Sequence, residues 1–255
     1  MLRSIRLFTA FLFAFFTCIN FSFSLKENTS LKKLPIVFAF NTPLNKVAET
    51  ICAEKNVNAA ADVYSLMSLD KKGLSKQAFE LALKGYNKLL HKRLVRNKNI
   101  ITVVDFSKPS NEKRLFVIDL KKDKVMFQSL VAHGRNSGLE YATSFSNDND
   151  SHKSSLGFYV TMNTYSGECG YALKLKGCDK GFNDHAFERA IVIHGSKYVT
   201  NDFLNSNGFL GRSFGCPALP ETISKKIIDV IKNGSCVFLY YPTQKYLAHS
   251  PVLNG

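Results

Sequence analysis

The sequence predicts a mainly β domain that follows a helical N-terminal segment. From residue 98 onward, short runs rich in β-branched and aromatic residues alternate with turn residues, which is typical of β-strands. Before residue 98, apolar residues recur at three- and four-residue steps, which indicates helices. With 45% hydrophobic and 21% charged residues, the 255-residue chain has the composition of a folded protein with a core. The same composition excludes a disordered protein.

The first 24 residues have the pattern of a secretory signal peptide. Arg3 and Arg6 precede an apolar stretch over residues 7–23, and this stretch ends in the small-x-small sequence Ser22-Phe23-Ser24. The stretch is nearly long enough to span a membrane, so an uncleaved anchor is the alternative. Polar residues interrupt it and favour cleavage. We therefore expect residues 1–24 to be removed and the protein to be exported to the periplasm or cell envelope.

Residues 25–97 are predicted as a helical N-terminal extension. Leu44–Lys55 and Ala59–Leu69 carry weak helical periodicity and suggest two short helices. Ser75 is expected to cap a stronger helix, because an apolar stripe follows it. That stripe consists of Phe79, Leu83, Tyr86 and Leu90.

Residues 98–250 are predicted as the catalytic-size domain, made mostly of strands. The expected strands are Ile100–Phe106, Arg114–Leu120, Val125–Ala132, Gly157–Thr164, Tyr171–Leu175, Ala190–His194 and Cys236–Tyr241. One helix is expected over Pro220–Lys232, since Pro lies in its first turn and Gly234 follows its end. Residues 191–193 are apolar without alternation, which predicts a central strand buried on both faces.

The charge balance is basic, with 34 Lys+Arg against 20 Asp+Glu and a formal net charge of +14. Such a balance favours a polyanionic partner. Export argues against nucleic acid, and the lysines are scattered rather than interleaved with aromatic residues. We expect no nucleic-acid partner and a mostly solvated basic surface, with anionic envelope polymers as a second class of partner.

Five cysteines follow the leader, an odd number that leaves at least one thiol unpaired in an oxidising compartment. They are Cys52, Cys169, Cys178, Cys216 and Cys236. We predict a disulfide between Cys169 and Cys178, with Cys216 left free. Two alternatives are open: pairings that use Cys52 or Cys236, and a state in which all five thiols are reduced and buried.

A zinc site is not expected from the cysteine and histidine spacing. Cys169, Cys178, His185 and His194 are separated by eight, six and eight residues, without the short intervals typical of zinc ligands. The sequence also contains no His-Glu-x-x-His motif. We therefore expect neither a metal nor another cofactor.

One group of residues has the composition of a cysteine-dependent active site. His194-Gly195 ends an expected buried strand, and the run 211–217 (Gly-Arg-Ser-Phe-Gly-Cys-Pro) follows closely, just before the expected helix. The positive end of that helix, Arg212 and a nearby imidazole are expected to favour the thiolate of Cys216. A cysteine nucleophile requires a thiol with a lowered pKa, a nearby base and free backbone N–H groups that bind the oxyanion. A small buried cysteine and a structural histidine remain the alternative.

These segments resemble the L,D-transpeptidases of bacterial cell walls, which have the YkuD-type catalytic domain. The likeness is greatest to the murein L,D-transpeptidase catalytic domain family, and it extends from about Ser75 to Ser250. Besides the His-Gly and Gly-Cys motifs, it rests on Val103–Ser107, Arg114–Asp119, Val131–Gly138, Phe145–Asn147 and Ser154–Thr161.

The resemblance implies a YkuD-like β-sandwich or barrel and acyl transfer at peptidoglycan stem peptides. By this likeness Cys216 is the nucleophile that expels the terminal D-alanine through a thioester, and His194 is its base. Oxyanion and support roles fall to Gly215, Ser213, Gly195 and Ser196, with the Gly215 and Cys216 N–H groups as oxyanion donors. Substrate binding falls to Arg212, which would hold a stem-peptide carboxylate, and to His133, for which a structural role is the alternative.

The sequence also departs from the family's pattern. Phe214 stands where many members have a second histidine, and Ala218 where many have asparagine. Three functions remain open: an L,D-transpeptidase, an L,D-carboxypeptidase that uses water as acceptor, and a non-catalytic wall-binding module. The nucleophile does not separate the first two, because the acceptor is selected by the shape and dryness of the groove.

Overall fold

The computed structural model describes residue 60 and residues 62–255. The expected signal peptide, the expected helix Leu44–Lys55 and Cys52 lie outside these residues. Within the described part, no helix combines the length and the apolar character needed to cross a membrane.

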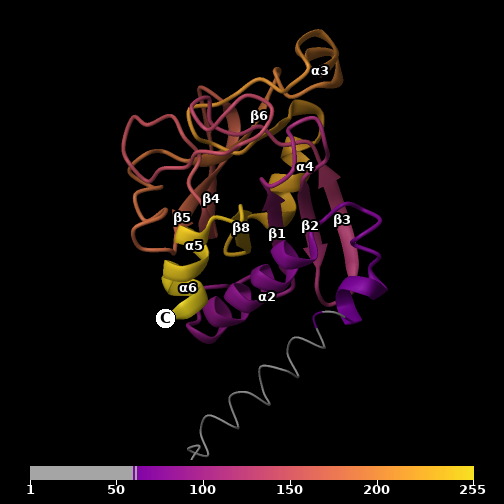
Figure 1. Cartoon of the computed structure of the whole chain (residues 1–255), viewed down its shortest axis with the longest axis vertical. Coiled ribbons are helices and arrows are strands. Elements are labelled where there is room, and N and C mark those ends of the chain that lie inside the picture. The colour runs from indigo at the N-terminus through magenta and orange to yellow at the C-terminus, as the bar shows by residue number, and fades with distance from the viewer. Residues whose placement is uncertain (1–59, 61) are drawn as a thin grey trace, which may run out of the picture. The chain divides into compact units, whose positions relative to one another are not determined.

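One eight-stranded sheet forms the centre of the protein, so the predicted mainly β fold is confirmed (Figure 1). Its strands lie in the order β3-β2-β1-β8-β4-β5-β6-β7. Their bounds are β1 Ile100–Asp105, β2 Leu115–Asp119, β3 Lys124–Ser129, β4 Gly157–Gly167, β5 Gly170–Gly177, β6 Val192–Ser196, β7 Ala218–Pro220 and β8 Cys236–Tyr240.

The sheet curves until its two edges nearly meet. Neighbouring strands are antiparallel except for the pairs β1–β8 and β6–β7, which are parallel. Ala132, which follows edge strand β3, forms a bridge to Ala218 of edge strand β7. Nearby, Gly134 bridges to Ser213. These two bridges make the fold a nearly closed barrel and bring the chain around Ser213 against the end of β3.

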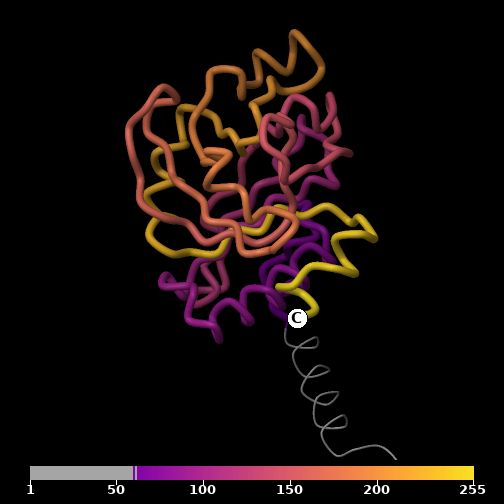
Figure 2. The backbone as a smooth tube through the Cα atoms, turned by 90° about the vertical axis from the view of Figure 1, so that its left-hand side faces the viewer, coloured from indigo at the N-terminus to yellow at the C-terminus, as the bar shows by residue number. Residues whose placement is uncertain are grey.

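The helix α2 (Lys76–His91) covers part of this sheet and begins where the sequence predicts. Ser75 caps it by accepting the Ala78 N–H. The helix packs against β1 and β8, and at its C-terminal side against the last helix of the chain (Figures 1 and 2). Gly85 lets α2 approach β4 closely, because a Cβ there would lie 2.0 Å from the Phe158 ring. Buried residues of α2 belong to the same hydrophobic core as those of the sheet. The boundary at residue 97 between the helical extension and the catalytic-size domain remains a prediction.

Residues 62–66 are helical, inside the expected helix Ala59–Leu69. Four further helices lie in the C-terminal half and are α3 Asn201–Asn207, α4 Glu221–Ile231, α5 Gln244–His249 and α6 Pro251–Asn254. The helix α4 packs against β6. Their contact depends on Gly195, whose added Cβ would meet the Ser224 hydroxyl oxygen at 2.6 Å. The glycine after the expected base thus lets the helix approach the strand.

Most expected elements are present within two or three residues of their predicted bounds. The short strand β7 and the helices α3, α5 and α6 were not predicted. The apolar stripe of α2 is confirmed at Phe79 and Tyr86 only, since Ala82 and Leu89 are buried in place of the expected Leu83 and Leu90, which are partly buried. The strand β6 is buried as predicted but not central, because only β7 separates it from the edge.

Candidate active site

The parallel pairing of β6 with β7 brings the expected base and nucleophile into one region. In this register His194 pairs with Ala218, and Ala218 is two residues after Cys216. The Cys216 sulfur accepts a hydrogen bond from the Val192 N–H, in the same strand as His194, at 3.4 Å. Both Cys216 and His194 line one cavity of about 610 Å³. Residues that are separate in sequence therefore face a common space.

The Cys216 thiol is held in its protonated form. Burial raises its pKa to about 11, although the Val192 N–H and the guanidinium of Arg189 act in the opposite direction. The thiol also approaches the Ala190 carbonyl, with the sulfur 3.8 Å from the oxygen. The expectation that its surroundings favour the thiolate is therefore wrong, because desolvation outweighs the charges around it.

The turn before Cys216 is organised by Ser213. Its hydroxyl donates to the Cys216 carbonyl at 2.6 Å and accepts the Gly215 N–H at 3.0 Å. Gly215 has a φ of 126°, a conformation that a residue with a side chain rarely adopts. Since Ser213 occupies the Gly215 N–H, that group is not free as an oxyanion donor. The Cys216 N–H makes no hydrogen bond to the residues that the structure describes, which leaves it as the candidate.

The His194 ring is oriented by the backbone of the next residue. Its Nδ1 lies 2.8 Å from the Gly195 carbonyl oxygen, and since a carbonyl only accepts, Nδ1 carries the proton. Nε2 is then unprotonated and able to accept a proton. Burial lowers the His194 pKa and outweighs the opposing Gly195 hydrogen bond, so the ring is neutral at pH 7. Ser196, which ends β6, also lines the cavity.

The two expected substrate-binding residues lie in different environments. Arg212 lines the cavity and donates to the Arg135 and Gly138 carbonyls, both at 3.2 Å. His133 is fully buried, and its Nδ1 lies 2.7 Å from the Arg114 guanidinium. Burial and the Arg114 charge lower its pKa to about 3. This environment fits the structural alternative for His133 and keeps its ring out of the cavity.

Arg189 supports the Cys216 turn and was not expected from the sequence. Its guanidinium is half-buried and donates to the Ser155 hydroxyl and the Lys153 carbonyl at 2.6 and 2.8 Å. It also lies 3.4 Å from the position that a Cβ on Gly215 would occupy. The sequence around Arg189 did not indicate this role, because the serine hydroxyls and carbonyls that its guanidinium binds lie in loops far away in the sequence.

The cavity wall also includes the end of the β4–β5 hairpin. Its full lining is Glu168, Cys169, Gly170, His194, Gly195, Ser196, Lys197, Tyr198, Arg212, Ser213, Phe214, Cys216 and Glu221. Phe214, at the position where many family members have histidine, is 64% exposed. Its ring lies against His152 with the centroids 4.5 Å apart. An aromatic pair therefore borders the cleft where the family pattern has an imidazole.

The predicted disulfide between Cys169 and Cys178 is wrong, since both thiols are free in the structure. The strand β5 lies between them and is eight residues long. At roughly 3.3 Å per residue the first and last Cα atoms of this strand are about 23 Å apart, whereas a disulfide needs Cα atoms within about 7 Å. Cys216 and Cys236 are also free thiols.

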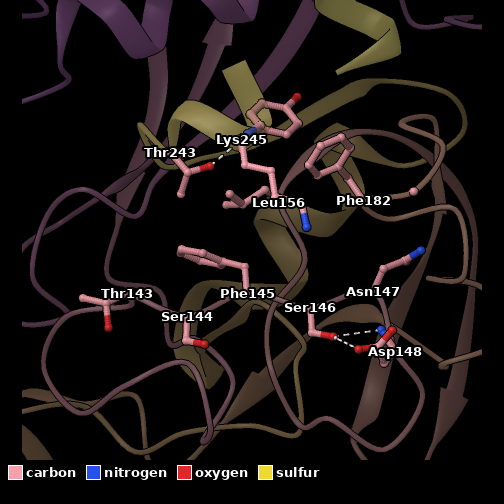
Figure 3. Close-up of a pocket in the computed structure, with 12 residues that line it drawn as sticks. Thr143, Ser144, Phe145, Ser146, Asn147, Asp148, Leu156, Phe182, Thr243 and Lys245 are labelled. Atoms are coloured by element: carbon pink, nitrogen blue, oxygen red, sulfur yellow. Dashed lines mark hydrogen bonds between the residues drawn. The ribbon is translucent and has the colours of Figure 1, made fainter. Parts of the chain in front are cut away.

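A second cavity, of about 360 Å³, is lined by a different set of residues (Figure 3). Phe145, Leu156 and Phe182 line it, and Lys245 enters it from α5. Neither His194 nor Cys216 is among its lining residues. Across residues 60 and 62–255, no three His, Cys, Asp or Glu side chains gather in a way that would hold a metal ion. The cavity at Cys216 is therefore the candidate site.

The protein therefore belongs to a mainly β class with a cysteine and a histidine in one cavity. The parallel strands β6 and β7 bring the two residues there. The chain belongs to the L,D-transpeptidase catalytic domain family, whose model matches residues 70–240, more than half of the sequence. A search of curated proteins finds no match.

Several solved structures are similar to the chain. The L,D-transpeptidase from Mycobacterium smegmatis has 11% identity and a TM-score of 0.36 over 56% of this chain and 59% of that one. The helical cell shape determining protein Pgp2 from Campylobacter jejuni has 16% identity and a TM-score of 0.40 over 63% and 54%. The chain thus spans less than two thirds of either structure's length.

Proposed function

We propose that the protein is an exported cysteine acyltransferase that acts on peptidoglycan stem peptides as an L,D-transpeptidase. The observation that carries the proposal is the shared cavity of His194 and Cys216 in a chain of this family. A non-catalytic wall-binding module would need neither a buried thiol nor an oriented imidazole beside it.

The reaction has two acyl transfers. The Cys216 sulfur attacks the carbonyl that precedes the terminal D-alanine, and Nε2 of His194 takes the thiol proton. The thioester forms, the peptide bond breaks, and D-alanine leaves as an amine that receives the proton. An amine of a second stem then attacks the thioester, gives up a proton to His194 and releases the Cys216 thiol.

The resting pair is neutral in this mechanism. Cys216 has a pKa of about 11 because it is buried, and His194 has a lowered pKa for the same reason. A thiolate–imidazolium pair is therefore disfavoured before substrate arrives. Proton transfer to His194 accompanies the attack of sulfur on the carbonyl, as in general-base catalysis.

Two further groups serve the substrate. The Cys216 N–H stabilises the oxyanion that forms on the attacked carbonyl, since the neighbouring Gly215 N–H is engaged by Ser213. The Arg212 guanidinium, at the cavity wall, binds a stem-peptide carboxylate. Ser213 itself is a positioning residue, because it acts through the backbone on both sides of the turn.

Muropeptide analysis tests this function. Purified peptidoglycan is incubated with the protein, with Cys216→Ala, and with Cys178→Ala, a control that changes a thiol outside the cavity. We expect new cross-linked muropeptides with the unchanged protein and the control, and none with Cys216→Ala.

The products also decide between acceptors. Release of tripeptide stems without cross-links would show that water, not an amine, is the acceptor. The protein would then be an L,D-carboxypeptidase. Product formation by a folded Cys216→Ala variant would refute the cysteine mechanism altogether.

A further inference from the structure

The cavity at Cys216 contains a second thiol that the proposed reaction does not use. Cys169 lies at the tip of the β4–β5 hairpin, where a two-residue turn joins Gly167 to Gly170. Cys169 and Cys216 both line the cavity that contains His194. Negative charge on Cys169 adds to the effect of burial in raising the Cys216 pKa, so the two sulfurs lie within electrostatic reach.

The hairpin tip has little packing to hold it in place. Residues 165–170 are all exposed, and a Cβ on Gly170 would meet no atom within 4 Å. Gly170 has a φ of 69°, which the absence of a side chain permits. A disulfide requires Cα atoms about 4.4–6.8 Å apart. An exposed two-residue turn at the cavity wall has the freedom to adopt that spacing above Cys216.

We propose that Cys169 and Cys216 form a reversible disulfide when a hydroperoxide reaches the cleft. This inference rests on the proposed function, in which Cys216 is the nucleophile. The bond would join the hairpin to the turn before β7 and occupy the sulfur that attacks substrate. The protein would then be inactive until a dithiol reduced it.

The exposed thiol is the one that meets the oxidant first. Cys169 is exposed, whereas the Cys216 thiol is buried and protonated at pH 7 because its pKa is about 11. Thiol oxidation follows exposure and thiolate character, and both disfavour direct attack at Cys216. Oxidation of Cys216 therefore depends on Cys169.

The atoms and electrons balance in two steps. The Cys169 sulfur attacks one oxygen of hydrogen peroxide, the O–O bond breaks, and a sulfenic acid forms with release of water. The Cys216 sulfur then attacks the Cys169 sulfur while His194 accepts its proton, and the S–O bond breaks. The departing hydroxide takes that proton and becomes the second water. Two thiols are oxidised to one disulfide, and one peroxide is reduced to two waters.

The test compares the full chain with Cys169→Ser and with Cys178→Ser, a control thiol outside the cavity. Each protein is treated with hydrogen peroxide and then analysed by non-reducing peptide mapping and by alkylation of Cys216. We expect a Cys169–Cys216 cross-link and loss of Cys216 alkylation in the unchanged protein and in the control. In Cys169→Ser, Cys216 should remain alkylatable at the same peroxide dose.

Transpeptidase activity, relative to each protein's own reduced form, should follow the same pattern and return after addition of a dithiol. Equal loss of Cys216 alkylation in the unchanged protein and in Cys169→Ser would overturn the proposal. So would a bridge from either thiol to Cys52, Cys178 or Cys236. Mapping and alkylation require no peptidoglycan, so they test the disulfide even if the proposed activity fails.

Discussion

At the scale of single residues, the candidate site couples a buried thiol to a neutral imidazole. Desolvation raises the pKa of Cys216 to about 11 and lowers that of His194. Each effect disfavours the charged form of its group, so the proton stays on sulfur until a reacting carbonyl is present. The thiol is thereby protected from reagents that require a thiolate.

This protonation state predicts how Cys216 reacts with iodoacetamide. A thiol with a pKa of about 11 contains more thiolate with each step toward higher pH. Its alkylation rate should therefore rise without a plateau between about pH 7 and pH 10. The rate is measured by mass spectrometry of the Cys216 peptide, which separates it from the exposed Cys169. A plateau near pH 7 would show a thiolate–imidazolium pair instead.

The role of His194 predicts a large kinetic effect of its replacement. His194→Gln should lower the rate of product formation by about 10²–10⁴-fold, the usual contribution of a positioned base. The fold should persist, since glutamine can still donate to the Gly195 carbonyl. His185→Gln, at an exposed position, should leave the rate unchanged. If both variants retain full activity, His194 has a structural role only.

The sequence pattern selected residues that line one cavity, but it did not indicate their environments. His194, Arg212, Ser213 and Cys216 all line the cavity at Cys216. Their protonation depends on burial by segments far away in sequence, which no local motif reports. Arg189 was missed for the same reason, since its partners lie 34–43 residues earlier in the chain.

At the scale of elements, α2 shows how closely helix and sheet are fitted. Gly85 lies directly over the Phe158 ring, which is fully buried. That ring stacks on Phe238 with the centroids 4.1 Å apart, so it has no room to move away. A helix interior normally favours alanine over glycine by about 1 kcal/mol. Here the contact with Phe158 outweighs that preference.

Gly85→Ala should therefore destabilise the protein, although it improves helix propensity. Overpacking of a tight core costs roughly 1–3 kcal/mol, which equals or exceeds the gain in propensity. Urea unfolding should show a lower free energy of unfolding for this variant. Lys84→Ala, one position away on the exposed face, provides the matched control and should be neutral. A Gly85→Ala protein more stable than the unchanged one would contradict this packing.

The elements that were predicted correctly have local signals, and those that were missed do not. The strands β1 and β2 are β-branched runs, and α4 has a proline at its start and a glycine after its end. The strand β7 has only three residues, and α5 and α6 have six and four. Such short segments form because the rest of the fold provides their partners, so periodicity within them carries little information.

At the scale of the whole molecule, Asp179 joins the loop after β5 to the C-terminus. The carboxylate is fully buried and accepts hydrogen bonds from Phe158 N–H, Tyr246 O–H, Ser250 O–H and Val252 N–H. These donors come from β4, from α5 and from the start of α6. A single side chain thus connects three parts of the chain that pack beside the sheet.

Asp179→Ala should lower the free energy of unfolding by at least about 2 kcal/mol, because each buried donor left unpaired costs roughly 1–3 kcal/mol. Chemical unfolding followed by circular dichroism measures the change. Asp202→Ala, at an exposed position on α3, should have little effect and serves as the control. Equal stability of the two variants would show that water satisfies the four donors.

The position of β8 has a consequence for the order in which the protein can assemble. It lies between β1 and β4, so without it the strands β1–β3 and β4–β7 are joined only at the far edge, where Ala132 bridges to Ala218 of β7. Yet β8 is the last strand to leave the ribosome, and its partner Val103 precedes Phe238 by more than half the chain. Pairings so distant in sequence form slowly. The eight-stranded sheet therefore cannot be completed until residues 236–240 have been synthesised.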